Sequence, residues 1–113
     1  MEAWSNRNIM TQVVIAERKL LYSLKAKQDR REFTVRVYLP RRIDEKTMGG
    51  WFDDDARICT VELAGLNERN IDSHGADSLQ ALTFAADVDR WLQRLSKKYD
   101  FYYLTGEPYF DEV

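Results

Sequence analysis

The chain has 113 residues, of which 44% are hydrophobic, and it contains five glycines and two prolines. This composition excludes a disordered or collagen-like chain and predicts a single globular domain over residues 1–113. The formal net charge of −2 provides no general attraction to nucleic acid or to an anionic membrane. Residues 1–50 carry 11 basic and 6 acidic side chains, whereas residues 51–113 carry 6 and 13. Either the charges of the two halves interleave on the folded surface, or the second half presents an acidic surface.

The sequence also predicts the compartment. No apolar run reaches the roughly 18 residues that a membrane-spanning helix needs. Residues 1–10 lack the basic start and apolar core of a signal peptide. Cys59, the one cysteine, lies at an apolar position and is expected to be a buried, inert core residue. We therefore expect a cytoplasmic protein, with residues 1–11 as an N-terminal arm.

Three segments show the alternation of half-buried strands. Residues 33–40 place apolar side chains at every second position until a proline ends the pattern. Residues 58–64 alternate in the same way. Residues 12–24 keep one parity except at Arg18, so they could form a strand or a helix. We favour a strand because residues 26–31 form a polar connector and because the strand that follows needs a neighbour. Three consecutive strands favour an antiparallel meander.

From Ser78 onward the hydrophobic period changes from two to about 3.6 residues. Apolar residues recur at steps of three and four: Ala81, Ala85, Val88 and Leu92. This pattern predicts one helix over residues 77–98, with Asp77 or Ser78 accepting a hydrogen bond from the first turn. Residues 101–104 then form a short aromatic strand. The predicted fold class is α+β, in which an antiparallel sheet of three to four strands is covered on one face by a single long C-terminal helix and followed by the short aromatic strand.

Residues 41–55 and 67–75 are polar and are predicted to be loops. In the second loop, Asp72, Ser73 and His74 include the residue types of a hydrolase triad. Residues so close in sequence seldom converge in the required geometry, and turn hydrogen bonds are a commoner use of the same side chains. We expect no catalytic residue, no cofactor and no enzyme activity, and a deep polar pocket around Asp72 and His74 would reopen that question.

Three further patterns have a functional alternative. The aspartates at 53–55 lack the spaced acids, the glycine and the final glutamate of a calcium loop, so we expect a solvated loop and no metal site. Glu17 and Lys19 form half of a metal-dependent nuclease pattern, without the preceding acid. The third pattern is a basic face that could bind single-stranded nucleic acid. The net negative charge of the chain disfavours it. Such a face would consist of Arg30, Arg31, Arg36, Arg41 and Arg42, interleaved with Phe33 and Tyr38.

One aromatic and acidic constellation suggests a function. Tyrosine and tryptophan are common anchors of protein interfaces, and carboxylates attract a basic partner. We therefore predict a partner-binding surface that consists of Trp51, Phe52, Asp53, Asp54, Asp55, Tyr102, Tyr109, Phe110, Asp111 and Glu112. The alternative is that these aromatic residues complete the core and that the acids solvate its rim.

Residues 15–20 (IAERKL), 65–67 and 75–82 (GADSLQAL) resemble a family of small uncharacterised bacterial proteins. The resemblance covers about residues 12–98, and it implies an α+β fold without assigned active residues. The chain is also similar in style to the immunity proteins of bacterial toxin systems, including contact-dependent growth inhibition. That similarity implies a non-enzymatic module that binds and neutralises a cognate toxin domain, for example a basic nuclease. The alternatives are a nucleic-acid-binding protein and a homodimeric structural protein that pairs through an open sheet edge or through the Trp51 loop.

Overall fold

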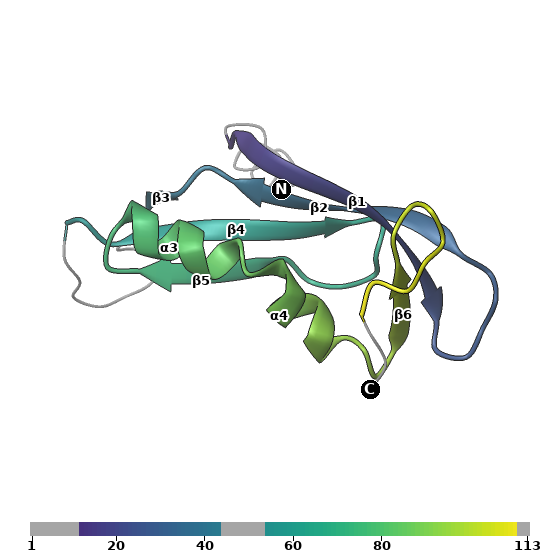
Figure 1. The fold of residues 1–113 in the computed structure, drawn as a ribbon. Helices are drawn as coiled ribbons and strands as arrows, with labels where there is room; N and C mark the ends of the chain where they lie inside the picture. Colours follow the sequence, from purple (N-terminus) through teal and green to yellow (C-terminus); the bar gives the residue numbers. More distant parts are fainter. Residues whose placement is uncertain (1–11, 44–53, 111–113) are drawn as a thin grey trace, which may run out of the picture.

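The computed structural model describes residues 12–43 and 54–110. Within them the chain forms a six-stranded antiparallel sheet, and two short helices lie on one of its faces (Figure 1). The elements in chain order are β1 (Val14–Leu24), β2 (Arg31–Tyr38), β3 (Arg41–Arg42), β4 (Arg57–Ala64), β5 (Ile71–Gly75), α3 (Ser78–Ala85), α4 (Val88–Arg94) and β6 (Tyr99–Tyr102).

The strands follow one another across the sheet. β1 pairs with β2, β2 with β4 and β4 with β5, all antiparallel, so the predicted meander is confirmed. Arg57 of β4 pairs with Arg42 on one side and with Gly75 on the other, which places β3 and β5 on opposite sides of β4. The predicted loop over residues 41–55 therefore begins with a short strand. β6 returns beside the last four residues of β1.

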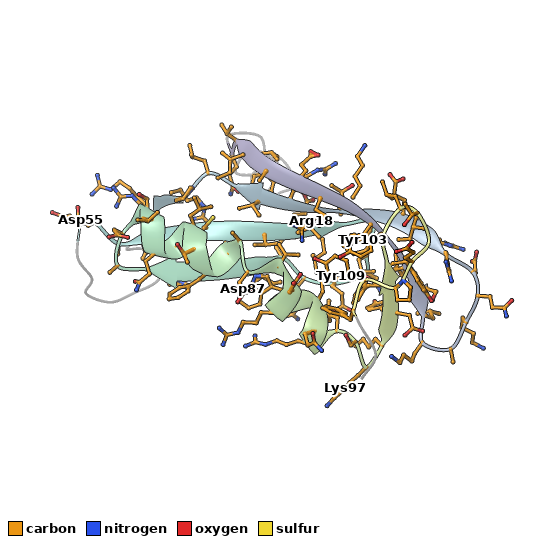
Figure 2. The ribbon with its side chains drawn as sticks, viewed as in Figure 1. Arg18, Asp55, Asp87, Lys97, Tyr103 and Tyr109 are labelled. Carbon is orange, nitrogen blue, oxygen red and sulfur yellow. The ribbon has the colours of Figure 1, made fainter. Side chains whose placement is uncertain are left out.

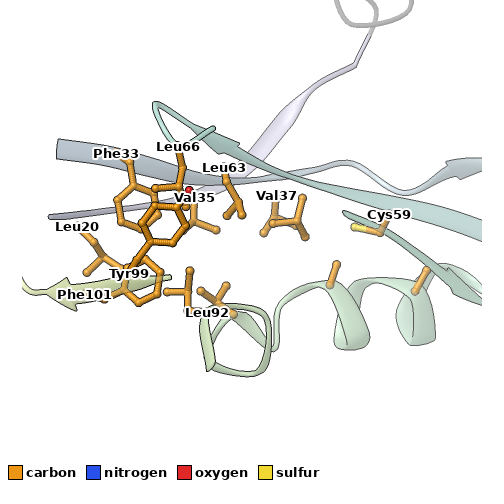
Figure 3. Close-up of a cluster of buried hydrophobic side chains, with 14 residues drawn as sticks. Leu20, Phe33, Val35, Val37, Cys59, Leu63, Leu66, Leu92, Tyr99 and Phe101 are labelled. Atoms are coloured by element: carbon orange, nitrogen blue, oxygen red, sulfur yellow. The ribbon is translucent and has the colours of Figure 1, made fainter. Parts of the chain in front are cut away.

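The core lies between the sheet and the helices (Figure 3). The register places apolar side chains directly opposite one another on adjacent strands, for example Val35 beside Leu63. Phe33, Val35 and Leu63 are almost completely buried, because every second residue of β2 and β4 points toward the helices. Cys59 is also fully buried, as expected, and burial raises the pKa of its thiol.

The single long helix predicted over residues 77–98 is wrong, and with it the predicted fold class. α3 ends at Ala85, and α4 begins at Val88. Between them Asp87 leaves the helical conformation, with φ −77° and ψ 65°, and the Val88 N–H donates to the carbonyl of Ala86 at 2.8 Å. The described structure is mostly antiparallel sheet and contains two short helices of eight and seven residues.

The apolar stripe of the predicted helix is nevertheless buried. Both helices direct it toward the sheet, and each of its members is at most 8% exposed: Ala81, Ala85, Val88 and Leu92. The Trp91 indole N–H donates to the carbonyl of Ala85 at 3.1 Å. This bond satisfies a carbonyl at the end of α3 that would otherwise lack a partner in the helix. The hydrophobic period of about 3.6 residues therefore predicted which side of residues 78–94 is buried, but it did not predict the break between the two helices.

The predicted loop over residues 67–75 is also partly wrong, because its last five residues form β5. Ser73 lies opposite Cys59 and shares its core-facing side of the sheet. Its hydroxyl is small and polar, and Gly75 has no side chain, so β5 lacks the hydrophobic alternation of a strand. A Cβ atom on Gly75 would lie 2.3 Å from the backbone nitrogen of Ala81, which shows how closely α3 packs on β5.

We expect Gly75→Ala to lower the free energy of unfolding by roughly 1–3 kcal/mol, because the added methyl group overlaps the α3 backbone. Urea unfolding measures this change. His74→Ala alters the exposed neighbouring residue and is expected to stay within about 0.5 kcal/mol of wild type. Equal stabilities of Gly75→Ala and wild type would contradict the close contact between β5 and α3.

Candidate functional site

The predicted aromatic and acidic surface is only partly described. Five of its residues lie outside the described ranges: Trp51, Phe52, Asp53, Asp111 and Glu112. Asp54 and Asp55 precede β4 at one end of the sheet, whereas Tyr102, Tyr109 and Phe110 belong to the region of β6 at the other end (Figure 2). The structure therefore does not bring the described acidic and aromatic members together.

The aromatic residues after β6 pack on the edge of the core. The ring centroids of Phe110 and Phe101 are 6.4 Å apart, and those of Tyr109 and Phe110 are 5.0 Å apart. The Tyr109 hydroxyl donates to Asp89 and accepts a hydrogen bond from Arg18. Burial, together with the bond to Asp89, raises the pKa of Tyr109 to about 12. Arg18 interrupts the apolar parity of β1 because its guanidinium reaches across to this tyrosine.

Tyr102 is covered in a different way. The Arg30 guanidinium lies 3.7 Å from the centroid of the Tyr102 ring and donates to the carbonyl of Gly106 at 3.0 Å. The Tyr102 hydroxyl is 3.1 Å from the hydroxyl of buried Ser23. Tyr109 and Phe110 thus pack against the core, which favours the alternative that they complete it, whereas Tyr102 contacts Arg30 and Ser23 without belonging to the core.

The charge gradient along the sequence does not produce an acidic half in the described structure. Ion pairs join the two halves of the chain: Arg18–Asp89 at 3.9 Å, Lys25–Asp100 at 2.9 Å and Arg36–Glu62 at 3.4 Å. The hydrogen bond from Lys25 lowers the pKa of Asp100, and burial opposes it to a smaller extent. The interpretation that charges interleave is confirmed for these residues.

The five arginines of the nucleic-acid alternative do not share one patch. Arg31 lies at the start of β2, with its guanidinium 3.3 Å from Asp29. Arg36 lies between Glu17 and Glu62, at 3.6 and 3.4 Å. Arg41 and Arg42 form β3 beside the start of β4, at the opposite end. This dispersed and partly neutralised arrangement does not favour a nucleic-acid surface.

The residues of the hydrolase alternative do not converge. Asp72 lies opposite Thr60 on the helix-free face of the sheet, and the Thr60 hydroxyl donates to its carboxylate at 2.6 Å. Ser73 points to the other face, where it is buried. A polar pocket of about 150 Å³ does include Asp72, but not His74. The candidate nucleophile Ser73 and the candidate base His74 therefore lie on opposite faces of β5, whereas a catalytic triad requires them to be hydrogen-bonded to each other.

That pocket has its own pair of hydrogen-bonded groups. The Tyr38 hydroxyl donates to the Glu62 carboxylate at 2.7 Å, and burial together with this bond raises the pKa of Tyr38. The same carboxylate is bonded by Arg36. The Glu62 carboxylate thus accepts hydrogen bonds from a tyrosine and an arginine of the chain itself.

Within residues 12–43 and 54–110, no three side chains of the metal-binding types gather closely enough to hold an ion. Over the same residues, neither helix has the length and apolar character needed to cross a membrane.

Two features of the helical region had no role in the sequence analysis. The first is the outer surface of α3: residues 78–86 include no charged side chain, and Leu79 and Phe84 are 71% and 44% exposed. The second is a pocket of about 650 Å³ between α4 and the turn that precedes β5. The uncharged run was visible in the sequence, whereas the pocket was not, because it joins segments that are about 20 residues apart.

No model of a known protein family, no curated protein and no solved structure matches the chain. The family resemblance therefore stays a prediction, and function has to be inferred from geometry.

The turn before β5 is held by Glu68. Its carboxylate accepts hydrogen bonds from the Tyr99 hydroxyl at 2.9 Å and from the Lys98 ammonium at 3.1 Å. Burial alone would raise the pKa of Glu68, but these two bonds and the Lys98 charge lower it. Burial and the bond to Glu68 raise the pKa of Tyr99 to about 12.

The raised pKa of Tyr99 predicts a loss of stability in alkali. Its contribution is complete below the ordinary tyrosine pKa of about 10 and is lost as the pH rises toward 12. Urea unfolding at several pH values is expected to show a shallower loss over this interval for Tyr99→Phe than for wild type. Tyr103→Phe, at an exposed tyrosine, is expected to follow the wild-type curve. Identical slopes for wild type and Tyr99→Phe would contradict the assignment.

Proposed function

We propose that this protein is a non-enzymatic module that binds another protein through the outer side of α3. This α3 surface consists of Leu79, Gln80, Thr83 and Phe84. The observation that supports it is an exposed helix without a single charge in a chain whose residues are 32% charged. The centres of protein interfaces are depleted in charged residues in the same way.

The polar members of the α3 surface are already hydrogen-bonded within the chain. The Thr83 hydroxyl donates to the carbonyl of Leu79 at 2.7 Å. The Gln80 side-chain oxygen accepts from the Ala76 N–H at 2.6 Å, while the Gln80 N–H donates to Asp77 at 2.8 Å. Burying these side chains in an interface therefore costs less desolvation free energy than burying polar groups without partners.

The apolar members supply the attraction. One exposed leucine is ordinary on a protein surface. Here Leu79 and Phe84 belong to one short helix, and burying each fully contributes about 1.5–3 kcal/mol. The close packing of Gly75 on Ala81, the bond from the Gln80 backbone N–H to Asp77 and the bond from the Ala76 N–H to the Gln80 side chain fix the helix before it binds. A fixed surface loses less conformational entropy on association.

As the partner we propose a bacterial toxin domain that is neutralised in the cytoplasm. The similarity in style to immunity proteins supports this choice. Asp54 and Asp55 precede the start of β4, and α3 begins shortly after the end of β5 that pairs with that start. Arg41, Arg42 and Arg57 lie at the same end, so its charge is mixed, and the choice of a toxin domain rests on the similarity in style.

The test takes a toxin domain encoded in a gene next to that of this protein and measures its binding by calorimetry; a gene neighbourhood without a toxin would contradict this choice of partner. Leu79→Glu and Phe84→Glu are each expected to weaken binding by about tenfold or more, because they place a charge in the centre of the interface. Leu104→Glu is the matched control, since Leu104 is 53% exposed and lies after β6.

Three results contradict the proposal: no binding by wild type, unchanged binding by both α3 variants, or a loss in Leu104→Glu alone. A loss of binding in Leu104→Glu alone would indicate that the interface lies in the aromatic region after β6. Sedimentation of the isolated chain tests the homodimer alternative, because a dimer that Leu79→Glu dissociates would make a second copy the partner.

A further inference from the structure

The pocket beside α4 has an apolar floor. It is formed by Leu63 at the end of β4, Ile71 at the start of β5 and Leu95 after α4. Its volume of about 650 Å³ lies within the range of about 300–1,000 Å³ that is typical of small-molecule sites. The floor continues the core, so a ligand there would rest on side chains that are already held in place.

Trp91 forms one wall of this pocket in a fixed orientation. Its indole N–H donates to the Ala85 carbonyl at 3.1 Å, which determines how the ring is turned. The guanidinium of Arg94 lies 5.2 Å from the centroid of the ring. An oriented indole next to an arginine is well suited to a flat ring that carries a negative charge.

The rim of the pocket has an excess of positive charge. Glu68 is the acid in its lining, and its carboxylate is already bonded by Lys98 and Tyr99. Arg69 and Arg94 form no ion pair with any acid among residues 12–43 and 54–110. Two guanidinium groups at one opening provide donors for a carboxylate or a phosphate.

Asn67 and Asn70 also line the pocket, and Asn70 lines the polar pocket beside Asp72 as well. Neither side chain forms a hydrogen bond with the other described residues. Each amide offers both a donor and an acceptor, as recognition of the edge of a heteroaromatic ring requires. Floor, wall and rim thus supply apolar contact, stacking, charge and hydrogen bonds in one place.

We infer that this pocket binds a small aromatic anion, with its flat ring against Trp91 and its carboxylate or phosphate between Arg69 and Arg94. The inference is independent of protein binding through the α3 surface, because none of the α3 surface residues lines the pocket.

Two probes cover the two anionic groups: AMP for a phosphate and indole-3-acetate for a carboxylate. Each is titrated into ¹⁵N-labelled protein, and the indole resonance of Trp91 is assigned with Trp91→Phe. At least one probe is expected to shift this resonance and the side-chain amides of Asn67 and Asn70 in a saturable way, with a Kd below about 1 mM. Adenosine, which has the ring of AMP without its phosphate, is expected to bind about tenfold more weakly than AMP if AMP is the ligand that binds.

Arginine variants decide whether the pocket is the site. Arg69→Gln and Arg94→Gln are each expected to weaken binding of the active probe by about tenfold, because each removes a charge-assisted bond. Arg31→Gln is the matched control, since Arg31 is exposed, is paired with Asp29 and lies outside the pocket. Leu79→Glu is expected to leave probe binding unchanged.

The inference is overturned if neither probe gives a saturable shift of the Trp91 indole. It is also overturned if both pocket variants bind as tightly as Arg31→Gln. If Leu79→Glu no longer binds the toxin domain but still binds the probe, the pocket and the α3 surface are separate sites. Ligand binding and protein binding can then each fail without the other.

Discussion

The close packing of α3 on β5 determines most of what is distinctive in this structure. The backbone of Ala81 approaches Gly75 so closely that no side chain fits at position 75. Ala81 and Ala85 add little bulk and are fully buried, so the axis of α3 lies near the sheet. Leu82 also packs against the core, whereas Leu79 and Phe84 lie on the outer side of the helix and are exposed. The α3 surface is thus a consequence of how the helix is docked.

The sequence predicted those elements whose signal is local. Alternation identified β1, β2 and β4, and the spacing of the apolar stripe identified the buried side of α3 and α4. β5 was missed because Ser73 and Gly75 are selected by close packing and carry no hydrophobic signal. The interruption at Asp87 was missed because the stripe keeps its period across it. The bond that accommodates the break comes from Trp91, six residues beyond the carbonyl that it satisfies.

The candidate site was harder to predict, for a different physical reason. The predicted sites consisted of charged and aromatic residues, and several of these contact partners far away in the sequence. Arg18 meets Asp89 and Tyr109, and Tyr102 is covered by Arg30. Such pairings depend on strand order, which composition does not encode. The absence of charge over residues 78–86 was readable in the sequence, and it becomes informative only once the outer side of that helix is known to be exposed.

Trp91 links the two regions that the proposals concern. Its ring forms a wall of the pocket, while its N–H supplies the hydrogen bond that the last turn of α3 lacks. Removing the indole N–H would therefore affect the end of α3 as well as the pocket, and loss of binding in such a variant would not identify one site. Arg94 lies 5.2 Å from the Trp91 ring, so its substitution can also reach the residue that caps α3, whereas Arg69 has no such contact with Trp91 in the described structure. For this reason Arg69, more than Trp91 or Arg94, separates a ligand site from a structural contact.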